Sequence, residues 1–135
     1  MRYILLVLLF TFAFSYTDLE ALQRVVYCEA RGEPDDGKLA VAYTVVNRSA
    51  KSGKSIEYEA TKKSQFCVYS GNMSETAAAL KCKTAANNAI QKSKPDPSNG
   101  ATFFYSGNVV PYWAKGLTPC ATIGGHKFFK NIAPY

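Results

Sequence analysis

The sequence has a single histidine and one tryptophan among its 135 residues. One histidine excludes the two-histidine mechanism of secreted ribonucleases, and it leaves no cluster of the ligands that zinc prefers. The longest apolar run, residues 3–14, is shorter than the roughly 20 residues that a membrane-spanning helix needs. The chain also has no internal repeat. We therefore expect one domain that holds no metal and no cofactor.

The first residues have the features of a secretory signal peptide. Arg2 supplies a positive charge, an apolar run follows, and Ala13 and Ser15 are the small side chains that signal peptidase accepts. We predict that residues 1–15 are removed and that residues 16–135 form the domain, with a retained anchor as the alternative. The net charge is +6, and the loss of Arg2 leaves about +5. A basic exported protein is attracted to anionic polymers, such as bacterial envelopes, nucleic acids or acidic glycans.

Four cysteines, Cys28, Cys67, Cys82 and Cys120, remain in the exported part. An even number favours two disulfides in an oxidising compartment, and three connectivities are possible. We favour Cys28–Cys120 with Cys67–Cys82, because this pairing includes one short local loop. Of the two N-x-S sequons, Asn72 follows a glycine in a predicted loop and is a better glycosylation acceptor than Asn47 if the source is eukaryotic.

The order of elements predicts helices followed by a small antiparallel sheet, an α+β fold. Thr17 and Glu20 fit a capping box that starts the first helix, which ends near residue 32. A second, almost entirely apolar helix begins at Asp35 or Asp36, which cap it, and runs to residue 47; its valines make a strand the competing prediction. Residues 49–64 are predicted as a loop with one helical turn, and a third helix runs from Ser74 to residue 90 or 92. Residues 101–105 are β-prone, and residues 121–129 form a hairpin around two glycines.

Glu29 stands on the same helix face as the apolar residues 22, 25 and 26. A carboxyl group there faces the core or a cleft, and burial favours the protonated form that a general acid needs. The alternative is a structural glutamate paired with Arg24, Arg31 or a lysine. Helical spacing by itself favours that alternative, so the wider sequence pattern has to decide.

A series of short blocks follows in a fixed order along the chain. They read EARGEP from residue 29, GKLAVA from 37, VVNR from 45, QFC from 65, ATFFY from 101, WA from 113 and TIGGHKFF from 122. This series resembles the SleB/CwlJ-like family of spore cortex-lytic cell wall hydrolases. The resemblance implies a small lysozyme-like α+β domain whose catalytic acid is the first glutamate of the EARGEP block, Glu29.

Members of that family act on the bond between N-acetylmuramic acid and N-acetylglucosamine, and some are lytic transglycosylases. An ordinary glycosidase needs two carboxyl groups about 5 to 9 Å apart, whereas a transglycosylase uses one as acid and then as base. The resemblance therefore implies that the protein acts on bacterial peptidoglycan. We expect a secreted monomer, or one in the lumen of a digestive compartment, with no nucleic-acid partner and, after signal cleavage, no stable membrane association. Whether water or the C6 hydroxyl completes the reaction stays open.

Seven further side chains are candidates for contacts with the substrate. They are Glu33, Gln65, Tyr69, Tyr105, Trp113, Thr122 and His126. Glu33 shares the face of Glu29 only if the helix continues, and the glycine and proline around it favour a structural or orienting role. Tyr105 and Trp113 offer flat faces for sugar rings, although buried aromatic side chains are commoner than binding ones. His126 either hydrogen-bonds near the cleft or is a structural histidine.

Cys28 and Cys67 occupy positions where bacterial members usually carry other residues. Disulfides there would brace the walls of the active site. One rival interpretation is a cysteine hydrolase that uses Cys28 or Cys67 with His126. Another is a catalytically inactive carbohydrate-binding or cationic antimicrobial protein on the same fold, which differs in that replacing Glu29 leaves its action unchanged.

Overall fold

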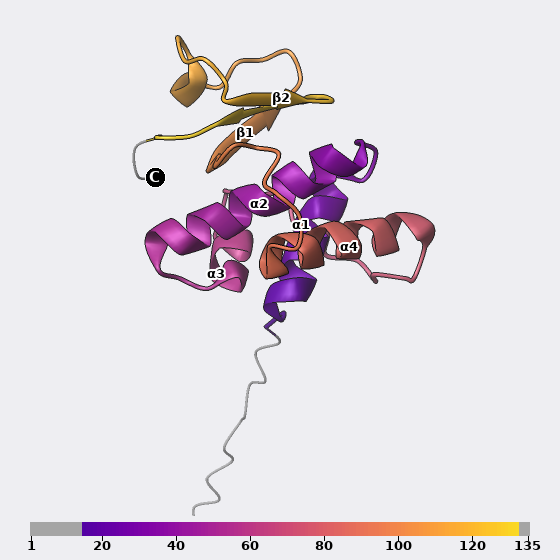
Figure 1. Ribbon diagram of the computed structural model, residues 1–135. Coiled ribbons are helices and arrows are strands. Elements are labelled where there is room, and N and C mark those ends of the chain that lie inside the picture. The colour runs from indigo at the N-terminus through magenta and orange to yellow at the C-terminus, as the bar shows by residue number, and fades with distance from the viewer. Residues whose placement is uncertain (1–14, 133–135) are drawn as a thin grey trace, which may run out of the picture.

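The computed structural model describes residues 15–132, so the predicted signal peptide lies outside the described residues except for its last one. Four helices come first in the chain and a three-stranded sheet follows them (Figure 1). The predicted α+β order is therefore confirmed. Among the described residues, no helix is long and apolar enough to cross a bilayer.

Local capping interactions set the first two helices. Helix α1 (Asp18–Ala30) begins after Thr17, whose Oγ1 accepts a hydrogen bond from the Glu20 N–H at 3.1 Å, as the capping signal predicted. Helix α2 (Asp35–Ser52) has Pro34 at its N-cap, so the prediction that Asp35 or Asp36 caps it is wrong. Both aspartates lie in the first turn instead, where negative charge favours the helix dipole.

Helices α3 and α4 differ in part from their predictions. Helix α3 (Ile56–Thr61) occupies the segment predicted as a loop with one helical turn, and Ser55 caps it by accepting the Tyr58 N–H. Helix α4 (Ala77–Gln91) begins after Thr76, whose hydroxyl caps the Ala79 N–H, and not at Ser74. The capping hydroxyl fixes the start of each helix because it satisfies an otherwise free amide.

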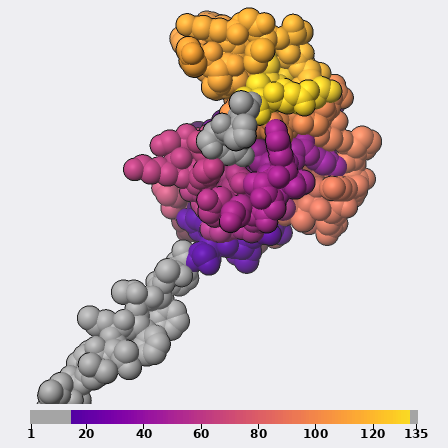
Figure 2. Space-filling view, turned by 90° about the vertical axis from the view of Figure 1, so that its left-hand side faces the viewer, coloured from indigo at the N-terminus to yellow at the C-terminus, as the bar shows by residue number. Residues whose placement is uncertain are grey.

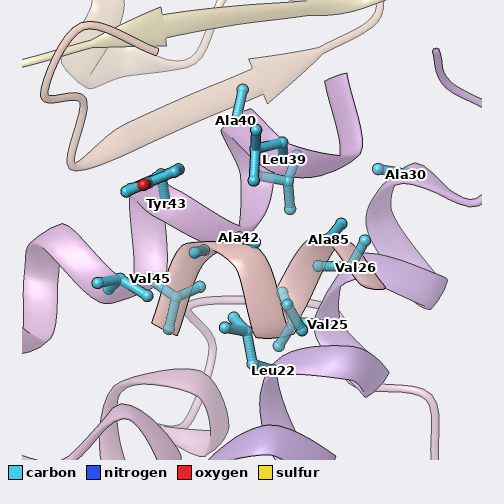
Figure 3. Packing of buried hydrophobic residues seen from close by; sticks show 14 of the residues in the cluster. Leu22, Val25, Val26, Ala30, Leu39, Ala40, Ala42, Tyr43, Val45 and Ala85 are labelled. Carbon is cyan, nitrogen blue, oxygen red and sulfur yellow. The ribbon is translucent and has the colours of Figure 1, made fainter. Parts of the chain in front are cut away.

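Helix α2 is the centre of the hydrophobic core. Every residue from 37 to 46 on it is buried, and it packs against α1, α3 and α4. Small and branched side chains of α1, α2 and α4 meet there, as Figure 3 shows for Leu22, Val45 and Ala85. A helix that is apolar on all sides is stable only when neighbours surround it. The same core anchors the last turn of α1, which carries Glu29, and the first turn of α2, which follows Glu33.

The sheet has the order β1-β3-β2 and is antiparallel throughout. Strand β1 spans Phe103–Ser106, β2 spans Ala121–Ile123 and β3 spans His126–Phe129, with a short 3-10 helix, η1 (Tyr112–Ala114), in the β1–β2 connection. Ile123 pairs with His126 across the predicted two-glycine turn. The sheet and its connection form an upper layer over the helices (Figure 2).

The two faces of the sheet have different surroundings. Phe104 and Phe128 pair across β1 and β3 and pack into the helical core. Phe103 and Phe129, which also pair, belong to a separate aromatic cluster with Trp113 on the outer face. Successive residues of a strand point to opposite faces, so the register assigns each sheet residue to one of the two clusters.

The disulfide pairing differs from the prediction. Cys28 is bonded to Cys67, with 5.6 Å between their Cα atoms, and Cys82 and Cys120 are free thiols. The pairing of Cys28 with Cys120 and of Cys67 with Cys82 is therefore wrong. The preference for a short local loop failed because residues 65–71 run back along α1, which places Cys67 beside Cys28 and not beside the buried Cys82.

Candidate active site

Glu29 lies in the last turn of α1 and is half-buried. Its Oε1 accepts a hydrogen bond from the backbone N–H of Cys67 at 2.8 Å. No donor from residues 15–132 contacts its Oε2 in the same way. The carboxyl group is thus oriented through one oxygen, while the other is available to exchange a proton with a bound molecule.

The segment that supplies this amide, residues 65–71, contains no helix or strand and is called the strap below. It runs along the second half of α1. The Tyr69 N–H donates to the Arg24 carbonyl at 3.2 Å, and Arg24 Nη1 donates back to the carbonyls of Tyr69 and Gly71 at 2.7 and 2.8 Å. The rings of Tyr69 and Tyr27 lie 4.8 Å apart. Tyr69, a predicted substrate contact, therefore lies beside α1 on the strap, the segment that also contacts Glu29.

Arg48 fixes the start of the strap. It is buried one turn before the end of α2, and its Nη1 donates to Gln65 Oε1 at 3.0 Å while its Nε donates to the Thr102 carbonyl. Its guanidinium also lies 4.4 Å from the centre of the Phe66 ring. Arg48 was not among the predicted site residues, although an arginine that directly follows the apolar part of a helix is a visible signal. It joins the strap to the chain just before β1 and holds Gln65 by its side-chain oxygen.

Glu33 is bound to the β2–β3 hairpin. Its two carboxylate oxygens accept the Gly125 N–H at 3.3 and 3.1 Å, and its Oε1 lies 3.4 Å from His126 Nδ1. Gly124 has a φ of +54°, and a Cβ atom there would lie 1.9 Å from Glu33 Oε2. The turn therefore needs glycine both for its backbone conformation and for the approach of the carboxylate. This geometry favours the orienting role that we predicted for Glu33.

His126 is almost completely buried at the start of β3. Its ring packs edge-on against Phe104 at 5.2 Å. Neither ring nitrogen has a hydrogen bond within the part of the chain that the structure describes, and Nδ1 reaches Glu33 only at ion-pair distance. The burial favours the structural alternative for His126, and its contact with substrate stays a prediction.

Three predicted site residues lie on the outer face of the sheet. The strand register aligns Tyr105, Lys127 and Thr122 in one row across β1, β3 and β2. Tyr105 stacks on Phe129 at 5.7 Å, and Trp113 packs edge-on against the same ring at 5.2 Å. This face is opposite to the one that carries His126. The structure therefore places Gln65 and Tyr69 on the strap that contacts Glu29, and it places Tyr105, Trp113 and Thr122 on the face of the sheet opposite to His126.

The cysteines offer no nucleophile of the kind that the rival interpretation requires. Cys28 and Cys67 are bonded to each other, so the proposal that either attacks as a thiolate with His126 is wrong for this structure. Burial raises the pKa of the Cys82 thiol and also that of the Cys120 thiol, which lowers the fraction of reactive thiolate. Within residues 15–132 there is no cluster of three possible metal ligands.

Two hollows in the surface of the described residues lie away from the predicted site residues. A hollow of about 210 Å³ between α2 and α4, lined in part by Leu39, Leu80 and Asn88, contains none of the predicted site residues. A second hollow of about 320 Å³ is lined by Tyr58, Glu59 and Thr102 among others and also lacks them. The candidate site is therefore defined by the hydrogen bonds of Glu29 and Glu33 and by the strap.

The fold is shared with the catalytic domains of two bacterial proteins. One is the crystal structure of the catalytic domain of the SleB protein of Bacillus cereus, with a TM-score of 0.69 over 87% of this chain and 93% of that one. The other is the catalytic domain of the germination-specific lytic transglycosylase SleB from Bacillus anthracis, with the same TM-score over 87% of this chain and 98% of that one. Each is 24% identical to this chain, a level at which the likeness establishes the fold.

The family follows from a second comparison. The family model described as cell wall hydrolase matches residues 32–129. The chain belongs to this family, and the resemblance drawn from the ordered blocks is confirmed. The matched segment contains Glu33 but begins after Glu29, so the role of Glu29 depends on the geometry described above. The comparison with curated proteins gives no match.

Proposed function

We propose that this protein cleaves the glycan strands of bacterial peptidoglycan between N-acetylmuramic acid and N-acetylglucosamine, with Glu29 as the general acid. The observation that carries this proposal is the state of the Glu29 carboxyl group. One oxygen is held by the Cys67 amide, and the other, which no donor of residues 15–132 contacts, can transfer a proton, in a chain of the cell wall hydrolase family. General acid catalysis requires a carboxyl group that is positioned in this way.

The reaction needs one proton donor at the leaving oxygen. Glu29 transfers its proton to the bridging oxygen, the bond from that oxygen to C1 of the muramic acid breaks, and N-acetylglucosamine leaves with a free hydroxyl at C4. The C6 hydroxyl of the muramic acid then attacks C1, and its proton passes to the Glu29 carboxylate. The product is a 1,6-anhydro end, and Glu29 returns to its starting state. In the hydrolytic variant a water molecule takes the place of the C6 hydroxyl.

The surroundings of Glu33 support catalysis by a single carboxyl group. Both oxygens of Glu33 face the hairpin, where they accept the Gly125 N–H and lie beside His126. A nucleophile or general base would have to release these contacts first. We therefore assign catalysis to Glu29 and position to Glu33, and we retain Gln65 and Tyr69 on the strap as candidates for contacts with the sugar.

The proposed setting is outside the cell or in the lumen of a digestive compartment. A disulfide within the described domain is typical of proteins in oxidising compartments. The sequence features of a signal peptide agree with this location. The net charge, +6 for the whole chain and about +5 without Arg2, also favours the approach of the protein to an anionic cell wall.

Mass spectrometry of the muropeptides released from purified peptidoglycan tests the proposal. We expect fragments that end in anhydromuramic acid from the wild type and none from Glu29→Gln, which should still sediment with the wall. Fragments with reducing ends would show that water is the acceptor. If wild type and Glu29→Gln released equally few fragments while both bound the wall, the protein would be a non-catalytic binder on the same fold.

A further inference from the structure

The middle of the strap is attached to the rest of the molecule in a different way from its ends. Gln65 at its start is held by Arg48, and Tyr69 and Gly71 at its end are held by Arg24. Between these anchors the strap has no regular backbone pairing. At Cys67 two interactions converge on adjacent residues of α1: the disulfide to Cys28 and the hydrogen bond to Glu29.

The connectivity makes a short closed path. It runs from Glu29 Oε1 to the Cys67 amide, through the Cys67 side chain to the Cys28 sulfur, and along one peptide bond back to Glu29. A closed path of this kind leaves few ways for the amide to move relative to the carboxyl group. The half-buried Glu29 lies at the helix end, where, among residues 15–132, the strap alone contributes a donor to its carboxyl group.

We propose that the Cys28–Cys67 disulfide is a positioning device for Glu29, which fixes the Cys67 amide on Oε1 and so directs Oε2 towards the substrate. This inference rests on the proposed function, in which Glu29 is the acid. A displacement of about 1 Å at a reacting group lowers a rate by as much as about 100-fold. Loss of the disulfide should therefore lower kcat more than it weakens substrate binding.

The two free cysteines provide a matched control. Cys82 and Cys120 carry no disulfide, and neither contacts Glu29 or the strap through a hydrogen bond. The variant Cys82→Ala/Cys120→Ala therefore keeps the bond under test and removes every other sulfhydryl of the predicted mature chain. The variant Cys28→Ala/Cys67→Ala removes only the bond and keeps the Cys67 backbone amide.

Kinetics with soluble glycan fragments test the effect on catalysis. We expect the kcat of Cys28→Ala/Cys67→Ala to fall at least about 10-fold from the wild-type value, while KM changes less than about 3-fold. The two proteins are compared at equal concentrations of folded protein, measured by circular dichroism. Dithiothreitol, which closes to its cyclic disulfide as it gives two electrons and two protons to the bond, should lower kcat of the wild type and of the Cys82→Ala/Cys120→Ala control equally. It should leave Cys28→Ala/Cys67→Ala unchanged. A disulfide-free variant with the kcat of the wild type would overturn the inference.

A second measurement requires neither activity nor a cysteine variant. In the oxidised protein, the amide proton chemical shift of Cys67 should follow the titration of Glu29 and lose this pH dependence in Glu29→Gln. After reduction the pH-dependent change should shrink. An amide shift that is the same function of pH in wild type and Glu29→Gln would contradict the inference. If the shift follows Glu29 but no glycan is cleaved, the positioning geometry stands and the proposed function fails.

Discussion

Two glutamates four residues apart, Glu29 and Glu33, have opposite environments. The Glu29 carboxyl group lies at the end of α1, accepts one backbone hydrogen bond and has no donor from the described residues at its second oxygen. The Glu33 carboxylate lies in the α1–α2 connection and has both oxygens directed at the β2–β3 hairpin. The strap orients the first carboxyl group, whereas the second carboxyl group attaches the sheet to the helices.

The difference follows from where α1 ends. If the helix continued past Ala30, residues four apart would share a face and both carboxyl groups would point the same way. The chain instead turns after Ala30, where the Glu33 N–H donates to the Ala30 carbonyl at 3.0 Å. One helix end thus separates a group available for chemistry from a group used for structure.

The largest expected effect on stability is that of Glu33→Ala. The change removes the acceptor of the Gly125 amide and a carboxylate at ion-pair distance from His126, so we expect a loss of about 2–3 kcal/mol in the free energy of unfolding. Urea unfolding measures it. Glu75→Ala, at an exposed position before α4, is the control and should change stability by less than about 0.5 kcal/mol. Equal effects of the two changes would contradict the role of Glu33 in attaching the hairpin to the helices.

Gly124→Ala tests the contact between Glu33 and the hairpin from the hairpin side. The left-handed backbone and the overlap with Glu33 Oε2 predict a loss of about 2 kcal/mol. In a Glu33→Ala background the overlap is absent, so the cost of Gly124→Ala should fall to that of the backbone alone. Gly32→Ala, where a Cβ atom meets nothing within 4 Å, is the matched control. Strict additivity in the double-mutant cycle would show that the two residues do not interact.

Much of the fold was predictable from local signals. The Thr17 cap, the apolar helix after residue 35 and the hairpin at the paired glycines each depend on residues close in sequence, and the structure has all three. The cysteine pairing was not predictable, because it depends on the path of the strap past α1. That path is set by Arg24 and Arg48, whose partners lie far along the chain.

The candidate site shows the same division. The position of Glu29 on the apolar side of α1 follows from helical spacing, whereas its hydrogen-bond partner comes from a segment without secondary structure. Tyr105 and Trp113 are aromatic residues of a matched block, and sequence does not state which face of the sheet they occupy. The strand register decides this, and it places their rings in the outer cluster.

Trp113→Ala should therefore affect stability more than catalysis. The ring is half-buried against Phe103 and Phe129, so we expect a loss of about 1 kcal/mol, below the value for a fully buried aromatic residue. The KM of the folded protein for glycan fragments should change less than about 3-fold. Thermal unfolding and initial rates on one preparation measure both. A large rise in KM without loss of stability would instead make Trp113 a sugar-binding residue.

The smallest expected effect concerns the free thiols. Burial raises the pKa of Cys82 and of Cys120 above the ordinary 9.0, so the unfolded chain loses these protons at a lower pH than the folded one. Their contribution to stability is therefore complete below pH 9.0 and is lost as the pH rises further. Urea midpoints against pH should fall more steeply for wild type than for Cys82→Ala/Cys120→Ala. Parallel curves would show that neither thiol is coupled to folding.

The most direct test compares Glu29→Gln with Glu33→Gln in one digestion of purified peptidoglycan. Both changes replace a carboxyl group by an amide of the same shape, and Glu33→Gln keeps an oxygen that accepts the Gly125 N–H. At equal amounts of wall-bound folded protein, we expect Glu29→Gln to release muropeptides at least about 1,000-fold more slowly than wild type, equivalent to about 4 kcal/mol in the barrier. Glu33→Gln should retain at least about a tenth of the wild-type rate. An active Glu29→Gln beside an inactive Glu33→Gln would contradict the assignment.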